Sequence, residues 1–164
     1  MNPIKKYFIV AAILFFASSV RAQDVNTVPQ NDTRIPDIDK LASEIKSNIS
    51  SYQKKEWSKD STGYRHSYFN NGELVMAVTY YKDTATEKHG EWYFKDGKFI
   101  FSMKLWTDVK TKDTIDYERF YLSNERLIAW YKFNISVDRN TVAYKKLNYM
   151  MRDYIADLRR ENEK

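Results

Sequence analysis

Three copies of a strand–turn–strand pattern decide the fold of this chain. They read YFNNGELVM at residues 68–76, YFKDGKFIF at 93–101 and YLSNERLIA at 121–129. The copies start 25 and 28 residues apart, and in each one aromatic and aliphatic residues flank a two-residue turn. An internal repeat of this kind predicts a sheet built from repeated hairpins.

The turn residues support that prediction. Asn71-Gly72 and Asp96-Gly97 are typical of type I′ turns, in which both central residues take a positive φ. The third turn, at 124–125, is the weakest, because its Glu tolerates that backbone conformation poorly. With polar loops at 82–88 and 107–113, three hairpins predict a six-stranded antiparallel meander within residues 63–134.

Helical periodicity flanks the repeat region on both sides. Apolar residues recur at three- and four-residue steps from Ile38 to Tyr52, which predicts a helix over roughly 38–55, capped by Asp37. Residues 140–161 show the same period. The predicted fold is therefore α+β: a six-stranded antiparallel meander sheet with an N-terminal and a C-terminal helix, both on one face.

The N-terminus has the layout of a signal peptide, residues 1–22. Lys5 and Lys6 precede an apolar run at 7–17, and Val20 and Ala22 supply short side chains before a cleavage site after Ala22. A membrane anchor is the alternative, but the run is about half of the ~20 residues that span a bilayer. We expect an exported protein, periplasmic or extracellular, with no transmembrane segment after cleavage.

Cleavage at that site defines the expected domain organisation. Residues 23–36 are polar and contain two prolines, which is typical of a flexible leader. Residues 37–164 then form a single α+β domain of ordinary size. Residues 1–22 hold three basic and no acidic residues, so the formal charge falls from +5 to +2 on cleavage.

Composition excludes several classes of function. The chain contains no cysteine, which excludes thiol catalysis and cysteine-based metal sites. Two histidines are too few for an ordinary zinc site, so we expect no metal and no cofactor. The small net charge without a clustered basic face predicts no nucleic-acid partner. In an exported chain, the absence of disulfides favours a bacterial periplasm or cell surface.

Counting outwards from each two-residue turn assigns every side chain to one of two faces. This count places Tyr68 opposite Val75, Tyr93 opposite Ile100 and Tyr121 opposite Ile128. One face should then form the core beneath the helices. Its expected members are Phe69, Leu74, Met76, Val78, Trp92, Phe94, Phe99, Phe101, Met103, Leu105, Phe120, Leu122, Leu127 and Phe133.

The opposite face is expected to be solvent-exposed and to carry the candidate binding site. The candidate residues are Tyr68, Tyr93, Tyr121, Trp130, His66 and Arg119. Aromatic rings beside charged groups can stack on a sugar or grip a peptide. The same residue types also stabilise the wet face of any sheet through cross-strand pairs, so a purely structural role stays open.

Catalytic motifs are not evident in the sequence. His66, Glu91 and Arg119 fall at equivalent places in the three copies and could converge, but no nucleophile motif or phosphate-binding loop accompanies them. The sequence therefore favours a non-enzymatic exported protein that binds a protein, peptide or glycan partner. A hydrolase of envelope polymers and a structural component of a cell-envelope assembly are the alternatives.

Residues 89–100, HGEWYFKDGKFI, carry a family resemblance that covers about 63–134. They resemble the MORN-type hairpin repeats of bacterial YwqK-like antitoxins. They are equally similar to uncharacterised exported β-meander proteins of Bacteroidota. The first resemblance implies an antitoxin or lipid-binding role, and an export signal argues against a cytoplasmic antitoxin. The second implies an exported β-meander without a known activity.

A shorter resemblance concerns glycosylation. The tripeptides Asp60-Ser61-Thr62, Asp83-Thr84-Ala85 and Asp113-Thr114-Ile115 resemble the O-glycosylation acceptor of exported Bacteroidota proteins. The resemblance implies glycans on Ser61, Thr84 and Thr114. Chance matches in polar loops are the alternative explanation.

Overall fold

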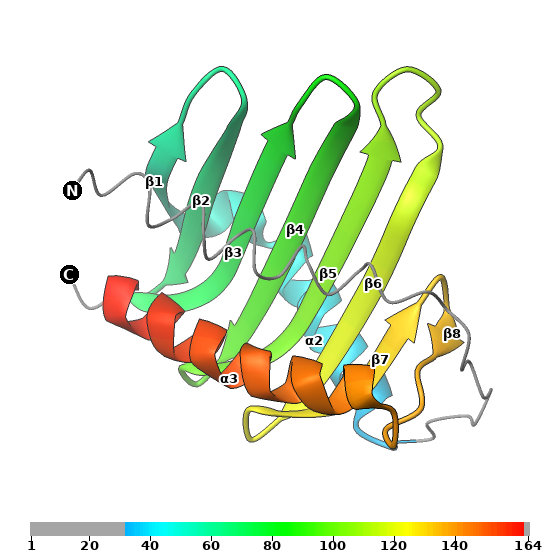
Figure 1. Ribbon diagram of the computed structural model, residues 1–164. Helices are drawn as coiled ribbons and strands as arrows, with labels where there is room; N and C mark the ends of the chain where they lie inside the picture. Colours follow the sequence, from blue (N-terminus) through cyan, green and yellow to red (C-terminus); the bar gives the residue numbers. More distant parts are fainter. Residues whose placement is uncertain (1–31, 163–164) are drawn as a thin grey trace. The chain divides into compact units, whose positions relative to one another are not determined.

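A computed structural model describes residues 32–162 and shows an antiparallel sheet, two α-helices and a short 3-10 helix (Figure 1). The predicted signal peptide and most of the predicted leader lie outside the described residues. Of the described residues, 32–136 belong to one compact unit and 137–162 belong to a second. The sheet and the first helix lie in the first of these units.

The sheet has eight strands in chain order, so each strand pairs only with its sequence neighbours. The strands are β1 (Gln53–Lys59), β2 (Gly63–Asn70), β3 (Glu73–Lys82), β4 (Thr86–Lys95), β5 (Lys98–Asp108), β6 (Thr114–Ser123), β7 (Arg126–Lys132) and β8 (Ile135–Ser136). The α+β class and the antiparallel meander are confirmed. The expected number of six strands is wrong, because β1 and β8 extend the sheet at its two edges.

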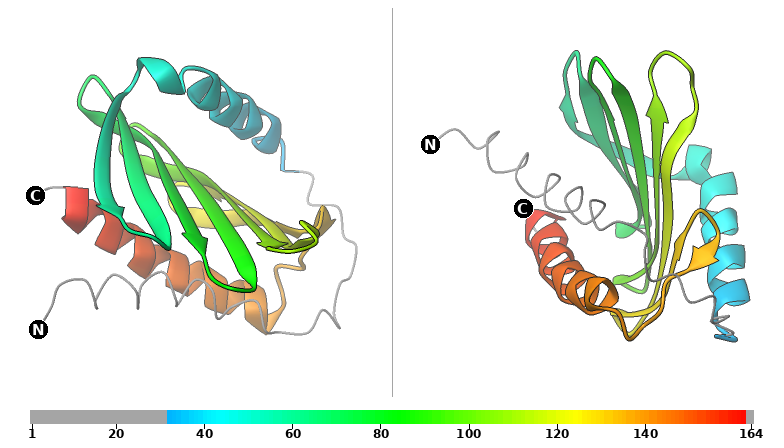
Figure 2. Two further views of the ribbon diagram at one scale, coloured as in Figure 1. Left: turned by 90° about the horizontal axis from the view of Figure 1, so that it is seen from above. Right: turned by 45° about the vertical axis from the view of Figure 1, so that its right-hand side comes forward.

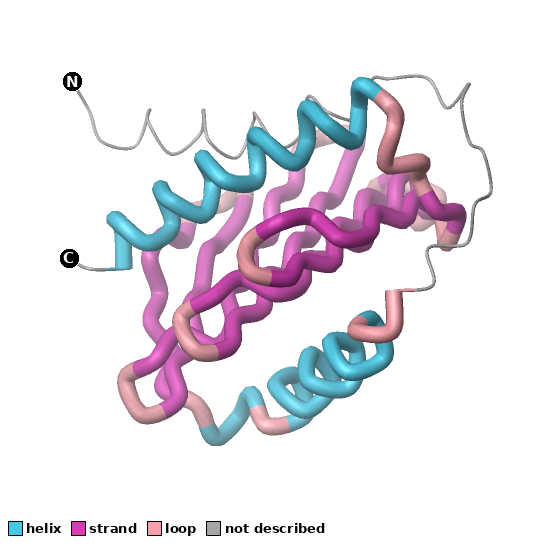
Figure 3. Tube along the Cα trace, turned by 90° about the horizontal axis from the view of Figure 1, so that it is seen from below, coloured by secondary structure: helices cyan, strands magenta, loops and turns pink. Residues whose placement is uncertain are grey.

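All three predicted hairpin turns have the expected backbone. Asn71 and Gly72 have φ of 50° and 83°, and Asp96 and Gly97 have 50° and 66°. Glu125 also takes a positive φ, 61°, although its side chain disfavours that region. The three turns lie at one end of the sheet, which Figure 3 shows from below.

A β-bulge follows the turn in every hairpin and changes the expected register. The pairing shifts at Tyr68/Phe69, at Tyr93/Phe94 and at Tyr121/Leu122. Each tyrosine therefore lies opposite a residue one position later than simple counting predicts. The actual partners of these tyrosines are Met76, Phe101 and Ala129.

Side chains alternate between the two faces along a strand. In each hairpin, the extra residue therefore places every later side chain of the second strand on the face opposite to the expected one. Met76 and Phe101 lie on the tyrosine face, whereas Trp130 lies opposite Phe120 on the other face. The predicted grouping of Met76, Val78, Phe101, Met103 and Leu105 with Phe69 and Phe94 is therefore wrong. The expectation that Tyr68, Tyr93 and Tyr121 share one face is correct.

Helix α2 spans Ile35–Ser47 and is followed by the 3-10 helix η2 (Ile49–Ser51). The helix begins before the predicted cap, so Asp37 lies in its first turn rather than at the cap. It ends where the backbone amide and the side-chain amide of Asn48 both donate to the carbonyl of Glu44, at 3.2 and 2.9 Å. The predicted helix to residue 55 is therefore too long, since β1 begins at Gln53.

The face that α2 covers is the tyrosine face (Figure 2). Ala42 and Ile45 of the helix pack in one cluster with Met76, Tyr93 and Phe101. The rings of Tyr93 and Phe101 lie 5.4 Å apart, and those of Phe101 and Tyr121 lie 5.0 Å apart. The expectation that this face is solvent-exposed is wrong beneath α2, where it forms a core.

The second described unit contains helix α3, Val142–Asn162. The hydroxyl of Thr141 accepts a hydrogen bond from the backbone amide of Tyr144 at 3.2 Å, as a cap at a helix start does. Tyr144, Leu147, Met151 and Ile155 are buried and follow helical spacing. In the described part of the chain, no helix combines the length and apolar character needed to cross a membrane. That α3 covers the same face of the sheet as the N-terminal helix stays a prediction.

Candidate functional site

The structure separates the six candidate binding residues. Tyr93 and Tyr121 are 2% and 0% exposed, and they lie in the core beneath α2. Trp130 is buried on the opposite face, where its indole stacks on Phe120 at 6.0 Å. Tyr68, His66 and Arg119 stay partly exposed on the α2 side.

Beside α2, the same face carries a second line of side chains, which we call the aromatic row: Tyr64, Tyr80, His89, Leu105 and Tyr117. These residues are direct cross-strand neighbours from β2 to β6. All five are partly exposed, whereas Tyr93 and Tyr121 are not. The aromatic surface that the sequence predicted therefore exists, but mostly on different residues.

Stacking orders the first part of the aromatic row. The rings of Tyr64 and Tyr80 lie 5.3 Å apart with an interplanar angle of 19°. His66 stacks on Tyr64 at 4.5 Å and 16°. Such cross-strand pairs stabilise a sheet, and here they also fix the orientation of partly exposed rings.

Exposed apolar side chains continue the aromatic row beyond its last member. Ile115 precedes Tyr117 by two residues on β6, at a β-bulge where the pairing with β5 skips it. The backbone amide of Phe133 donates to the carbonyl of Tyr117 at 2.8 Å, which places Phe133 next to the row. Ile115 is 46% and Phe133 43% exposed. Two exposed apolar side chains therefore occur close to Tyr117, and exposed apolar groups are typical of interaction surfaces.

Glu91 is the most strongly perturbed carboxylate of the described residues. Burial by itself would raise its pKa, but His89 at 2.9 Å, Lys46 at 2.8 Å and Tyr93 donate to it and lower the pKa to about 2. Burial and the same carboxylate raise the pKa of Tyr93. With three donors, Glu91 stays ionised near neutral pH and does not act as a proton acceptor there. Its carboxylate links β4 to α2.

Arg119 belongs to a separate polar group under the start of α2. Its guanidinium donates to the hydroxyl of Tyr121 at 3.3 Å and to the side-chain oxygen of Asn134 at 2.9 Å. Tyr121 in turn donates to Asp39 of α2 at 2.8 Å. Burial, and then the hydrogen bond to Asp39, raise the pKa of Tyr121, which keeps its hydroxyl protonated.

His66, Glu91 and Arg119 do not converge on one reacting point. They share a cross-strand line, but Val78 separates His66 from Glu91 and Met103 separates Glu91 from Arg119. Each of these three residues is therefore two strand intervals, of about 4.8 Å each, from the next one along the line. His66 contacts Glu56 instead, with 3.1 Å between Nε2 and Oε2. Burial, and then the charge of Lys54, lower the pKa of His66.

The opposite face of the sheet has a different chemistry. Lys104 and Glu118 are both buried and form an ion pair at 3.3 Å, and Lys132 pairs with Asp116 at 3.1 Å. Trp92 lies on this face over Gly90, where a β-carbon would come within 2.3 Å of the indole. No group of three or more His, Asp or Glu able to hold a metal ion occurs among the residues that the structure describes.

The three predicted glycosylation residues are all exposed. Ser61 and Thr84 lie in the connections β1–β2 and β3–β4, and Thr114 is the first residue of β6. In the first two loops the Asp that precedes the hydroxyl residue stabilises the turn. Asp60 accepts hydrogen bonds from the backbone amides of Thr62 and Gly63, at 2.7 and 2.9 Å. Asp83 accepts hydrogen bonds from the backbone amides of Ala85 and Thr86 in the same way. An Asp before a hydroxyl residue is thus also explained by turn formation.

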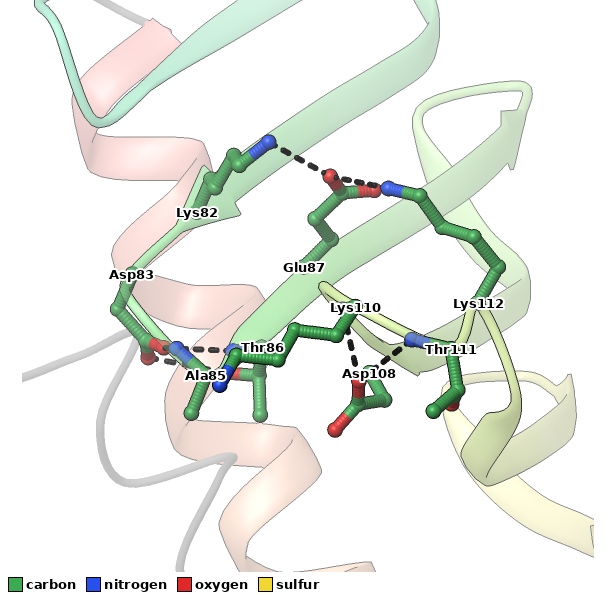
Figure 4. A network of polar contacts seen from close by, with 9 residues as sticks. All are labelled: Lys82, Asp83, Ala85, Thr86, Glu87, Asp108, Lys110, Thr111 and Lys112. Carbon is green, nitrogen blue, oxygen red and sulfur yellow. Dashed lines mark hydrogen bonds and ion pairs between the residues drawn. The ribbon is translucent and has the colours of Figure 1, made fainter.

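A third loop of the same kind is built on Asp108. Asp108, not Asp113, accepts the backbone amides of Lys110 and Thr111 at 2.7 and 2.9 Å (Figure 4). Those hydrogen bonds lower the pKa of Asp108. Nearby, Glu87 joins two strands and a loop by accepting from Lys82 and Lys112, each at 2.9 Å.

Comparison of the chain with protein families, with curated proteins and with solved structures found no match. The candidate site therefore stands on its own geometry. Sequence reasoning missed Tyr80, His89 and Leu105 as members of the aromatic row. The signal was available from the short β3–β4 connection, since pairing counted from the two-residue turn Thr84-Ala85 places Tyr80 opposite His89.

Proposed function

We propose that this chain is an exported, non-enzymatic protein that binds a protein, peptide or glycan partner through the aromatic row beside α2. The observation that carries the proposal is the continuity of the row across five strands, with every member partly exposed. Ile115 and Phe133 extend it with exposed apolar surface. His66 and Arg119, two of the candidates from the sequence, border it.

The Glu91 group supports binding over catalysis. A general base needs a pKa near the working pH and an unoccupied oxygen that faces the substrate. Glu91 has a pKa of about 2, and its two oxygens accept from three side chains. This carboxylate therefore suits a structural role, so the row is the better candidate for function.

Export rests on the pattern of residues 1–22 and on no structural observation. The proposal requires a mature chain that begins at Gln23. N-terminal sequencing of the protein recovered from outside the cytoplasm tests it. A chain that keeps residues 1–22 would contradict cleavage after Ala22.

Site-specific photo-crosslinking tests the aromatic row directly. We expect p-benzoylphenylalanine at position 80 or 117 to give partner adducts in intact cells of the source organism. Tyr149, which is 68% exposed on α3, provides a matched control tyrosine for the same replacement. Adducts from position 149, with none from 80 and 117, would overturn the proposal.

A further inference from the structure

The orientation of the rings limits what the aromatic row can bind. Tyr64 and Tyr80 are cross-strand neighbours, and their nearly parallel rings are 5.3 Å apart, close to the spacing of strands. His66 stacks on Tyr64 as well, at 4.5 Å. Tyr64 is therefore packed against two rings, which reduces the open aromatic face on which a sugar ring could stack.

At the β6 end of the row, Arg119 carries a charge without an acidic partner. None of the ion pairs among the described residues involves Arg119. Its guanidinium bonds only to neutral oxygens, of Tyr121 and Asn134. It lies 5.9 Å from the ring centre of Tyr117 and 5.2 Å from that of Tyr131, which hold it in place. A guanidinium has five donors; two are used here and Nε is buried, so one N–H of each terminal nitrogen stays available to an anion.

Cations also lie at the β2 end of the aromatic row. Lys59 is exposed and pairs with Tyr64 across β1 and β2. Lys54 lies two rows away on the same strand, and both lysines lower the pKa of His66 by repulsion, after the larger effect of burial. Glu56 acts in the opposite direction on the pKa of His66, so the β2 end holds two lysines and one carboxylate.

The carboxylates near the aromatic row are each engaged by donors of the chain itself. Glu56 contacts His66 at 3.1 Å. Glu87 is bridged by Lys82 and Lys112, and Glu91 by Lys46 (Figure 4 shows the Glu87 group). Among these groups, Lys54, Lys59 and Arg119 therefore outnumber Glu56 at the two ends of the aromatic row.

We propose that the partner is an acidic, extended segment of another protein, which lies along the aromatic row with its carboxylates on Arg119 and Lys59. This inference rests on the proposed function. Lys59 on β1 and Arg119 on β6 are five strand intervals of about 4.8 Å apart, so about seven extended residues at ~3.3 Å each would span the distance. A carboxylate can bind the guanidinium of Arg119 in a bidentate manner. Apolar side chains of the segment would pack on Ile115 and Phe133.

The test uses poly-L-glutamate as the probe and the mature full chain as the protein. We expect shifts of the NMR signals of Tyr64, Tyr80 and Arg119 on titration, and an affinity that falls as salt is added. Arg119→Gln should weaken binding at least tenfold, and Lys59→Gln several-fold. Arg126→Gln is the matched control, because it removes an equal charge at the exposed β6–β7 turn.

Three results would overturn the inference: no binding of poly-L-glutamate, equal losses for Arg119→Gln and Arg126→Gln, or tighter binding of polygalacturonate, an acidic glycan. Lys59 is exposed and outside the core, so Lys59→Gln keeps the test valid if Arg119→Gln fails to fold. Crosslinks from position 80 without affinity for poly-L-glutamate would refute the acidic segment and leave the proposed function standing. Absence of those crosslinks would refute the proposed function itself.

Discussion

The hydroxyl of Tyr93 donates a hydrogen bond to Glu91, two residues earlier on the same face of β4. Both side chains are buried, and the carboxylate also accepts from Lys46 of α2. Removal of a buried carboxylate leaves its donors without an acceptor, which costs more than the hydrogen bonds themselves contribute. The pair therefore fixes α2 on the sheet beside the aromatic row.

Glu91→Gln should destabilise the protein by about 2 kcal/mol at neutral pH, because Lys46 loses its counter-ion and Tyr93 its strongest acceptor. Urea unfolding monitored by circular dichroism measures the loss. Glu44→Gln is the matched control, since Glu44 is 57% exposed and pairs with Lys40 at 3.9 Å. That exposed pair should contribute less than about 0.5 kcal/mol. Equal losses in the two variants would contradict the role of Glu91.

The pH dependence of stability follows from the same carboxylate. The pKa of Glu91 is about 2 in the folded chain against 4.5 without the fold, so its contribution is complete above about pH 4.5. It is lost as the pH falls towards 2. The difference in unfolding free energy between wild type and Glu91→Gln should therefore shrink over that window. A difference that stays constant from pH 6 to pH 2.5 would show that the pKa is not lowered.

Gly90→Ala should destabilise the protein by about 1–3 kcal/mol, because the new β-carbon would lie 2.3 Å from the indole of Trp92. Trp92 is 6% exposed and cannot swing away freely. Thermal unfolding measures the effect. In a Trp92→Leu background the same change at position 90 should cost much less. An equal cost in both backgrounds would rule out the indole as the cause.

Glu125→Gly should be more stable than Glu125→Ala by about 1 kcal/mol. Both variants remove the side chain, but only glycine takes the φ of 61° at this turn without strain. The comparison between them cancels whatever the Glu125 side chain contacts. Chemical denaturation of the two variants checks the difference, and an alanine variant of equal stability would refute the strain.

Glycosylation at Ser61, Thr84 and Thr114 predicts an intact mass above that of the unmodified chain from Gln23 to Lys164. The three hydroxyl residues are exposed, as an acceptor must be. Mass spectrometry of protein from the source organism measures the excess, and Ser61→Ala, Thr84→Ala and Thr114→Ala should each reduce it. A mass equal to that of the bare polypeptide would exclude the modification.

The repeated hairpins could be predicted because their information is local. Asn71-Gly72 and Asp96-Gly97 determine turns within four residues, and the structure confirms both. The helix before the sheet was located but overextended to residue 55. Ile49 and Tyr52 continue its apolar spacing and pack on the same core, although they lie outside α2. Packing of a side chain on the core does not require the chain to stay helical.

The candidate site was predicted less well, and the bulges explain most of the difference. One extra residue after each turn reversed the faces expected for Met76, Phe101 and Trp130. Met76, Phe101 and Trp130 are all apolar and can be buried on either face of the sheet. Their hydrophobicity therefore does not reveal the bulge. The burial of Tyr93 and Tyr121 was missed for another reason. Tyrosine tolerates both water and core, and here Glu91 and Asp39 supply the hydrogen-bond partners that burial requires.

Strand order along the sheet repeats the order along the chain, without a crossover. A whole hairpin could consequently be duplicated or lost during evolution while every remaining connection kept its length and direction. The aromatic row would lengthen or shorten by two strands in each such event. The width of this surface, and with it the length of segment it can hold, is thus a property that selection can change in discrete steps.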